Sequence, residues 1–170
     1  PIPLIVPANE QGAGFMAAGY SRSTGQVGVA MVTSGPGATN MVTPVRDCMA
    51  DSIPMVVICG QVPRAAIGTD AFQEAPIAAL MGAVAKHVFL VTDPSKLEAT
   101  IRTAFVLARS GRPGPVVVDV PKDVQNWQGV YAGRGTLAST GVYQRRMREL
   151  DARRLGEAQL ESFFQILQGS

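Results

Sequence analysis

The chain is poor in the residues that build disulfide frameworks, metal centres and strongly charged surfaces. It has two cysteines and one histidine among 170 residues, and 15 basic against 13 acidic residues leave a formal net charge of only +2. Two cysteines cannot form a disulfide framework, and His87 has no second histidine or cysteine pair at zinc-ligand spacing. No apolar run reaches the roughly 18 residues of a membrane span. The arginines between 145 and 154 alternate with acidic residues, which indicates a solvated helix face rather than a nucleic-acid surface.

Familiar nucleotide and nucleophile motifs are also missing. No Gly-x-Gly-x-x-Gly opens a predicted helix, and no Gly-Lys-Ser/Thr follows a glycine-rich loop. Ser34 lacks the Gly-x-Ser-x-Gly elbow of serine hydrolases. The sequence therefore favours neither a dinucleotide, nor a nucleoside triphosphate, nor a serine nucleophile.

What the chain does contain is an alternation of short apolar runs and helix-length stretches. The predicted strands cover residues 2–6, 27–33, 55–59, 87–92 and 115–120, and the predicted helices cover 10–23, 37–51, 75–83 and 94–109. Because the strands are apolar throughout, they are typical of a parallel sheet covered by helices on both faces. We predict an α/β, doubly wound fold, whose ligands bind beyond the carboxyl ends of the strands.

The composition changes after Val120. We predict one domain over residues 1–126, a glycine-rich linker over 127–144, and the start of a second, truncated domain over 145–170. The apolar stripe of that last helical stretch is too narrow to form a domain by itself. Because the chain opens in the middle of what looks like a strand and lacks an initiator methionine, we expect the N-terminal part of the first domain to lie upstream.

Distinctive motifs lie next to four of the five predicted strands and in the segment between residues 59 and 87. Along the chain these motifs are Asn9-Glu10-Gln11-Gly12-Ala13-Gly14, Thr33-Ser34-Gly35-Pro36-Gly37-Ala38-Thr39-Asn40, Gly60-Gln61-Val62-Pro63, Gly68-Thr69-Asp70-Ala71-Phe72-Gln73-Glu74 and Ser110-Gly111-Arg112-Pro113-Gly114-Pro115. Glu10 stands at the start of a predicted helix, where the helix dipole and free N–H groups favour a carboxylate whatever its function.

Taken in this order, the motifs resemble the pyrimidine-binding domain of thiamine-diphosphate enzymes, and within them the catalytic subunits of acetolactate synthases (acetohydroxyacid synthases). The resemblance runs from about Leu4 to Gln125, and the Gly60–Pro63 and Ile67–Glu74 segments carry its narrower part. It implies a carboligase that decarboxylates pyruvate and joins it to a second 2-keto acid, pyruvate or 2-ketobutyrate, in branched-chain amino-acid (valine, leucine, isoleucine) biosynthesis. It also implies a homodimer or homotetramer formed through the pyrimidine domain, with a regulatory subunit as a further partner.

The resemblance assigns roles by position. Glu10 matches the carboxylate that hydrogen-bonds the pyrimidine N1′ of thiamine, and apolar neighbours are expected to shield it and raise its pKa. Gln73 is implied to act with it at the reacting end. The implied cofactor-binding residues are Glu10, Pro36, Asn40 and Gln73 for thiamine diphosphate and Ser52 and Arg112 for FAD, and the implied substrate channel consists of Pro63, Arg64, Phe72, Lys86 and Lys122.

The chain departs from the family pattern at two points. Asn9 stands where the family usually has histidine, and no Gly-Asp-Gly followed downstream by asparagine is present. We therefore expect the ligands of Mg²⁺ and of the diphosphate to lie outside these residues, and the chain to be inactive alone. Another carboligase, such as glyoxylate carboligase, and a non-catalytic docking module remain alternatives. The family implies a cytoplasmic protein in bacteria and a plastid or mitochondrial one in eukaryotes.

Overall fold

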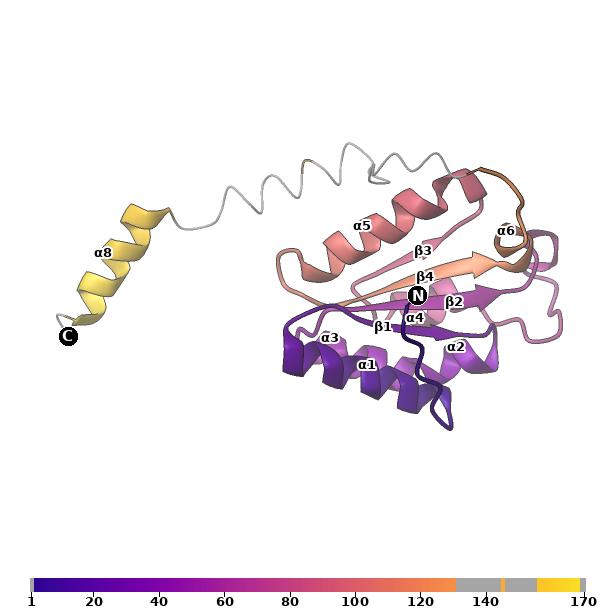
Figure 1. Cartoon of the computed structure of the whole chain (residues 1–170), viewed down its shortest axis with the longest axis horizontal. Coiled ribbons are helices and arrows are strands. Elements are labelled where there is room, and N and C mark those ends of the chain that lie inside the picture. The colour runs from indigo at the N-terminus through magenta and orange to yellow at the C-terminus, as the bar shows by residue number, and fades with distance from the viewer. Residues whose placement is uncertain (1, 131–144, 146–155, 169–170) are drawn as a thin grey trace. The chain divides into compact units, whose positions relative to one another are not determined.

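A parallel four-stranded sheet with helices on both faces forms the centre of the computed structural model, which describes residues 2–130, 145 and 156–168 (Figure 1). The strands lie in the order β1-β2-β4-β3, and every neighbouring pair is parallel. The elements are α1 (Glu10–Thr24), β1 (Gly28–Val32), α2 (Pro36–Asn40), α3 (Val42–Ala50), β2 (Met55–Gln61), η1 (Arg64–Ala66), α4 (Ile77–Gly82), β3 (His87–Leu90), η2 (Pro94–Lys96), α5 (Leu97–Arg109), β4 (Pro115–Pro121), α6 (Lys122–Gln125) and α8 (Glu157–Gln168). The predicted doubly wound α/β fold is confirmed.

The core lies on the two faces of the sheet. Helix α5 lies over one face, and α1, α2 and α3 cover the other (Figure 1). All seven residues of β4 are buried, which explains why its sequence is apolar throughout apart from Asp119. Both cysteines are buried as free thiols, and burial raises the pKa of Cys48 to about 11 and that of Cys59 to about 12. Both thiols are therefore protonated and unreactive at neutral pH.

Two predicted elements differ in the structure. Residues 2–6 form no strand, and Ile2, Leu4, Ile5 and Val6 are 72–94% exposed. Nothing among the described residues packs over this segment, so it buries too little apolar surface to offset the entropy lost on ordering. The predicted helix over 37–51 is divided into α2 and α3 at Met41. Pro44 has no N–H to donate to the carbonyl of Asn40, which prevents one continuous helix.

The chain divides into two compact units, residues 1–138 and 139–170. In the second unit the structure describes helix α8, whose apolar side chains, including Phe163 and Phe164, are exposed. Most of the predicted linker over 127–144, and the predicted helical residues 146–155, lie outside the described residues. The boundaries of the two predicted domains therefore stay predictions.

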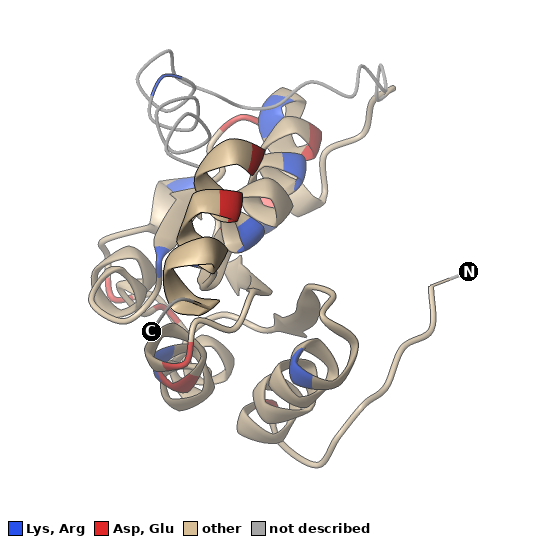
Figure 2. Cartoon of the chain, turned by 90° about the vertical axis from the view of Figure 1, so that its left-hand side faces the viewer, with Lys and Arg blue, Asp and Glu red and all other residues tan. Residues whose placement is uncertain are grey.

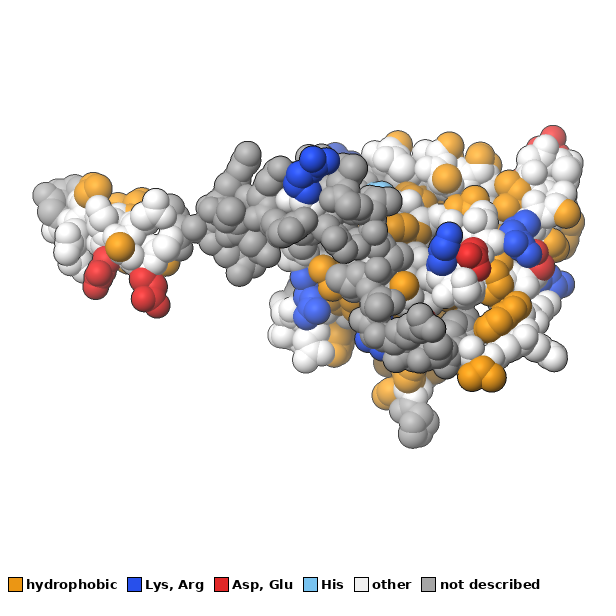
Figure 3. All heavy atoms as spheres, turned by 90° about the horizontal axis from the view of Figure 1, so that it is seen from above, with side chains coloured by type: hydrophobic (Ala, Val, Ile, Leu, Met, Phe, Trp, Pro, Cys, Tyr) orange, Lys and Arg blue, Asp and Glu red, His pale blue; other side chains and the backbone are white. Residues whose placement is uncertain are grey.

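Helices α1, α3 and α5 each carry both basic and acidic residues, whereas the charged residues of α8 are acidic. Figure 2 shows the charged residues in blue and red, and in the view from above in Figure 3 apolar side chains lie among polar and charged ones. In the part of the chain that the structure describes, every helix falls short of the length and apolarity needed to cross a membrane.

The close approach of α1 to the sheet depends on Gly28 at the start of β1. A Cβ at this position would lie 2.0 Å from the carbonyl oxygen of Ala17 in α1. Gly28→Ala should therefore lower the free energy of unfolding of the chain by about 2 kcal/mol, because backbone must shift to accommodate the methyl group. Urea unfolding followed by circular dichroism measures this change.

Gly19→Ala is the matched control, because a Cβ at Gly19 meets no atom within 4 Å and the residue lies inside α1. This substitution should raise the stability by about 0.5 to 1 kcal/mol through helix propensity. Equal effects of the two substitutions would contradict the assigned role of Gly28.

Candidate functional site at the carboxyl edge of the sheet

The parallel strands all end at one edge of the sheet, which we call the carboxyl edge, and begin at the opposite, amino edge. The carboxyl edge is marked by the last strand residues, Val32, Gln61, Leu90 and Pro121. Helix α1 begins at the carboxyl edge, because its C-terminal end leads through Gly25 into the start of β1. Open parallel sheets bind their ligands at this edge.

Glu10 and Asn40 meet at the carboxyl edge although 30 residues separate them. Asn40 donates a hydrogen bond from Nδ2 to Glu10 Oε2 at 2.9 Å. Glu10 is the first residue of α1, and the Asn9 side chain caps this helix by accepting the N–H of Gly12 at 2.7 Å. Asn9 therefore has a local structural role, since asparagine is among the best N-cap residues. The resulting pair presents one oriented carboxylate at a helix N-terminus.

The pKa of Glu10 is shifted in the opposite direction to the one expected from the sequence. The hydrogen bond from Asn40, and then the backbone N–H of Glu10 itself, lower the pKa of the carboxyl group. The neighbours expected to shield it do not do so in this chain, since Val6 is 82% and Phe15 43% exposed. The expected rise in the pKa of Glu10 is therefore wrong for the chain by itself, because solvent reaches the group and its charged form is hydrogen-bonded.

The turn after β1 contacts the loop that carries Gln73. Gly35 has a φ of +53°, and a Cβ there would lie 2.5 Å from the carbonyl oxygen of Gln73. Gln73 itself has a φ of +59°, a left-handed conformation that costs a residue with a side chain about 1 kcal/mol. The structure thus brings the Gly35-Pro36 turn and Gln73 together, next to the helix that carries Asn40.

Glu74 organises the Gln73 loop, although no role was predicted for it. Its carboxylate accepts the backbone N–H of Gly68 and, at 3.0 Å, that of Ala71. These hydrogen bonds, that of Gly68 foremost, lower the pKa of Glu74. A carboxylate that accepts two backbone N–H groups of its own loop has no characteristic spacing in the sequence, so no sequence motif could identify it.

Gln61 and Asp119 form a buried pair beneath the same loop. Gln61 Nε2 donates to Asp119 Oδ2 at 3.1 Å and to the carbonyl of Ala75 at 3.3 Å, and Gln61 Oε1 accepts the N–H of Val62 at 2.8 Å. Burial raises the pKa of Asp119 to about 6, and the hydrogen bond from Gln61 opposes this rise. Sequence analysis missed Asp119, although a single carboxylate in an otherwise apolar strand is a visible signal.

Three residues of the predicted substrate channel follow the ends of β2 and β4 at the carboxyl edge, and Phe72 lies in the Gln73 loop. Arg64 donates from Nε to Asp123 Oδ2 at 2.6 Å and from Nη1 to the carbonyl of Thr92 at 2.6 Å. Its guanidinium therefore ties together the segments that follow β2, β3 and β4. Lys122 begins α6, Pro63 precedes η1, and Phe72 is 89% exposed.

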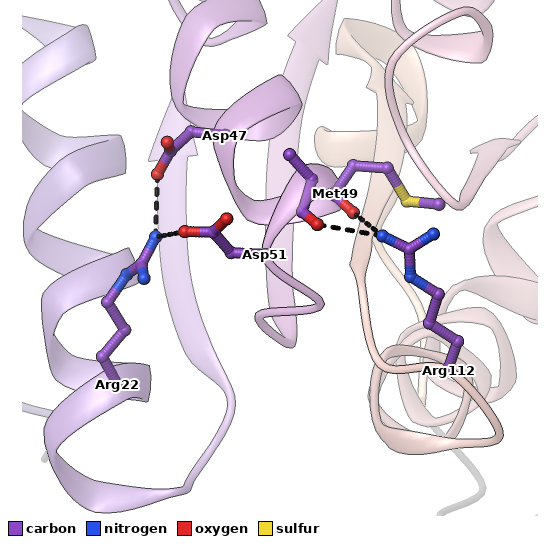
Figure 4. A network of polar contacts seen from close by, with 6 residues as sticks. Arg22, Asp47, Met49, Asp51 and Arg112 are labelled. Atoms are coloured by element: carbon purple, nitrogen blue, oxygen red, sulfur yellow. Dashed lines mark hydrogen bonds and ion pairs between the residues drawn. The ribbon is translucent and has the colours of Figure 1, made fainter.

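Ser52 and Arg112 lie at the amino edge, away from the other predicted cofactor residues. Arg112 donates from Nε to Ser52 Oγ at 2.9 Å. Its Nη2 donates to the carbonyls of Met49 and Ala50, each at 2.9 Å (Figure 4). The guanidinium therefore satisfies the C-terminal carbonyls of α3, where a cation is favoured. In the same view Arg22 pairs with Asp47 and Asp51 (Figure 4).

Lys86 also lies at the amino edge, because it directly precedes β3. Its ammonium group donates to the carbonyls of Leu107 and Ser110 at the C-terminal end of α5, and burial lowers its pKa. The structure does not bring Lys86 together with Arg64 and Lys122. Its contacts are those of a helix cap rather than of a channel residue.

The carboxyl edge offers an oriented carboxylate, an amide and a tight glycine turn, which suit a heterocycle with hydrogen-bonding nitrogens. Among the described residues, no group of three or more histidine, cysteine, aspartate or glutamate side chains could hold a metal ion. A carboxylate and an amide held this way can share a proton and form hydrogen bonds with nitrogens of an organic ring.

The buried carboxyl group of Asp119 makes the stability of the chain depend on pH. Its pKa is raised from 3.8 to about 6, so its contribution is fully present below pH 4 and is lost as the pH rises through 6. We expect the wild type to lose about 2 to 3 kcal/mol of unfolding free energy relative to Asp119→Asn between pH 4 and pH 8. Urea titrations of both proteins at each pH measure the difference. If the free energies of unfolding of the two proteins changed equally with pH, the assignment would be contradicted.

Comparison with known proteins agrees with this geometry. Residues 1–83 match the family model of the thiamine pyrophosphate enzyme, N-terminal TPP binding domain. The chain is 55% identical over 121 residues to acetolactate synthase 2, chloroplastic, of Nicotiana tabacum, covering 71% of the chain and 18% of that protein. It is 55% identical over 122 residues to acetolactate synthase 1, chloroplastic, of Zea mays, covering 72% of the chain and 19% of that protein.

A bacterial relative is equally similar. The acetolactate synthase large subunit of Corynebacterium glutamicum is 56% identical over 122 residues, which cover 72% of the chain and 20% of that protein. The chain spans about a fifth of the length of these curated relatives. Its first 83 residues match the N-terminal TPP binding domain of thiamine pyrophosphate enzymes, and 71–72% of the chain aligns with these acetolactate synthases.

Proposed function

We propose that the chain is the pyrimidine-binding part of an acetolactate synthase. This thiamine-diphosphate-dependent carboligase would decarboxylate pyruvate and condense it with a second 2-keto acid to give acetolactate or acetohydroxybutyrate, in branched-chain amino-acid biosynthesis. The observation that carries the proposal is the Asn40–Glu10 hydrogen bond at the carboxyl edge, in a chain 55% identical to plant acetolactate synthases. The names of these relatives favour this carboligase over glyoxylate carboligase.

Glu10 is proposed as the group that hydrogen-bonds the pyrimidine N1′ and holds a proton there. Asn40 supports this role, because its bond to Oε2 orients the carboxylate. When bound, thiamine diphosphate supplies the thiazolium carbon that makes bond cleavage next to a carbonyl possible. Pro36 and Gln73 are proposed to contact the cofactor from the turn and the loop that meet at Gly35, with Gln73 toward the reacting end.

The proposed enzyme needs a covering partner. Glu10 is solvent-accessible in the chain by itself, and the neighbouring side chains Phe15, Met16 and Tyr20 of α1 are 43–48% exposed. We propose that a second subunit of a homodimer or homotetramer covers this region and supplies the ligands of Mg²⁺ and of the diphosphate. Such burial would raise the pKa of Glu10 toward the range of a proton-sharing group.

The remaining assignments are proposed with different degrees of structural support. Arg64 and Lys122 lie at the carboxyl edge and are proposed, with Pro63 and Phe72, to line the substrate entrance. Lys86 is proposed as a channel residue on resemblance alone, since its ammonium group caps α5. FAD is proposed to contact Ser52 and Arg112. Because these residues lie at the amino edge, a flavin bound there would be structural and would lie away from Glu10 and Gln73 at the carboxyl edge.

A regulatory subunit is proposed as a further partner on the same resemblance. The relatives include chloroplastic plant proteins and a bacterial protein. We propose a plastid or mitochondrial location if the source is a eukaryote, and a cytoplasmic location if it is a bacterium.

Replacing Glu10 tests the proposal directly. In the full-length enzyme that contains this chain, Glu10→Gln should lower acetolactate formation from pyruvate by about 100-fold or more, because the amide cannot share a proton with N1′. The assay contains thiamine diphosphate, Mg²⁺ and FAD, and circular dichroism checks the fold. The 170-residue chain assayed alone should form no acetolactate.

Glu98→Gln is the control for loss of a carboxylate, because Glu98 forms only a surface ion pair with Arg102 at 2.9 Å. This variant should keep near-normal activity. A Glu10→Gln enzyme as active as the Glu98→Gln enzyme would remove the central assignment.

Gln73 is expected to act on carboligation more than on cofactor binding. In the full-length enzyme, Gln73→Ala should reduce the rate of acetolactate formation by about tenfold, because it removes a positioning contact. The dissociation constant of thiamine diphosphate should change by no more than about threefold, the loss of one weak hydrogen bond. Steady-state kinetics and a cofactor titration separate the two effects, and unchanged product formation would reduce Gln73 to a loop residue.

A further inference from the structure

Asp119 is the charged residue at the centre of the sheet, and the proposed reaction gives it no role. It is 1% exposed, and in the register of the sheet it lies between Cys59 of β2 and Leu90 of β3. Its Oδ2 accepts a hydrogen bond from Gln61, and its Oδ1 is buried without a hydrogen-bond partner among the described residues. Burying a polar atom without a hydrogen-bond partner costs free energy, so a carboxylate at this position needs an explanation.

The one side chain that Asp119 binds leads directly to the Gln73 loop. Gln61 Nε2 contacts both Asp119 Oδ2 and the carbonyl of Ala75, and Gln61 is itself only 5% exposed. Ala75 is two residues from Gln73, whose left-handed backbone packs against Gly35. Residues in such conformations persist only where the surroundings hold them.

We propose that Asp119 is a positioning residue for the candidate site: through the Gln61 amide it holds the Ala75 carbonyl and so fixes the Gln73 turn against Gly35. Asp119 aligns Gln61 by accepting one of its two amide hydrogens, which directs the other to Ala75. The amide oxygen is fixed separately by the N–H of Val62, so Gln61 keeps one orientation. The effect of Asp119 on catalysis rests on the proposed function, whereas its effect on the Gln73 turn does not.

The electrostatic surroundings agree with this role. Among the described residues no basic side chain pairs with Asp119; its hydrogen-bond partner is the neutral Gln61, and the titratable group beside it in the sheet register is the thiol of Cys59. The proximity of Asp119, after burial itself, raises the pKa of Cys59, so this thiol stays neutral. A carboxyl group without a counter-ion is a poor stabiliser of the core, which argues that its hydrogen bond to Gln61 is what the position requires.

Amide hydrogen exchange on the full 170-residue chain tests the proposal without any cofactor. Asp119→Ala and Gln61→Met should each speed exchange of the amides of residues 71–77 by about tenfold relative to those of β2 and β4, the effect of one lost buried hydrogen bond. Asp119→Asn keeps an acceptor for the Gln61 amide, so in this variant the amides of residues 71–77 should exchange at rates within about threefold of those in the wild type. This rescue separates a hydrogen-bonding role from mere occupancy of the position.

Val118→Ala is the matched control, because it removes buried volume from the neighbouring residue of β4 without touching Gln61. It should speed loop and strand amides alike. The proposal is overturned if Asp119→Ala leaves the loop as protected as in the wild type, if it speeds the loop and the strands equally, or if Asp119→Asn behaves like Asp119→Ala. Should Asp119→Ala fail to fold, Gln61→Met decides the question, since it removes the same link and leaves Asp119 in place.

Kinetics of the full-length enzyme give the catalytic arm of the test. Asp119→Ala should lower kcat for acetolactate formation while the KM for pyruvate stays within about twofold, and Asp119→Asn should restore kcat. A wild-type enzyme that forms no acetolactate would contradict the proposed function and leave the exchange result standing. An active wild type whose Asp119→Ala variant keeps full kcat would contradict the positioning role alone.

Discussion

The pairing of β2 with β4 is the interaction on which the rest of the structure depends. These two strands are matched over seven residue pairs, from Met55 with Pro115 to Gln61 with Pro121, and both run in the same direction. Because β4 pairs with β2, residues 60 positions apart in the sequence become neighbours. The pairing also brings the loops that follow both strands to one edge of the sheet, where Arg64 of one binds Asp123 of the other.

The carboxyl edge is assembled largely by backbone groups and by side chains that bind backbone. Glu74 closes its loop on two N–H groups, Gln61 holds the Ala75 carbonyl, and Gly35 admits the Gln73 carbonyl because it lacks a Cβ. Few side chains at this edge are left to contact a ligand, and the Glu10–Asn40 pair is the most clearly oriented of them. A rigid backbone around a small number of exposed polar groups is what a precisely oriented heterocycle requires.

The two edges of the sheet divide the cationic side chains by role. At the amino edge Arg112 and Lys86 bind the last carbonyls of α3 and α5, so their charge complements helix dipoles. At the carboxyl edge Arg64 is paired with a carboxylate, and Lys122 begins a short helix. Arg112 and Lys86 therefore stabilise the fold by contacts already made, whereas the substrate-channel role of Lys122 stays a proposal.

The sequence by itself determined the alternation of strands and helices, the parallel sheet and the resemblance to thiamine-diphosphate enzymes, because burial on both faces forces β-branched runs and the glycine turns need particular residues. It placed Glu10, Asn40 and Gln73 as candidates but could not show which of them touch. Only the tertiary structure decided that Asn40 binds Glu10, that Lys86 caps α5, and that Asp119 reaches the Gln73 loop through Gln61. These contacts join segments distant in the chain, and their formation depends on strand order and register, which no local pattern of residues encodes.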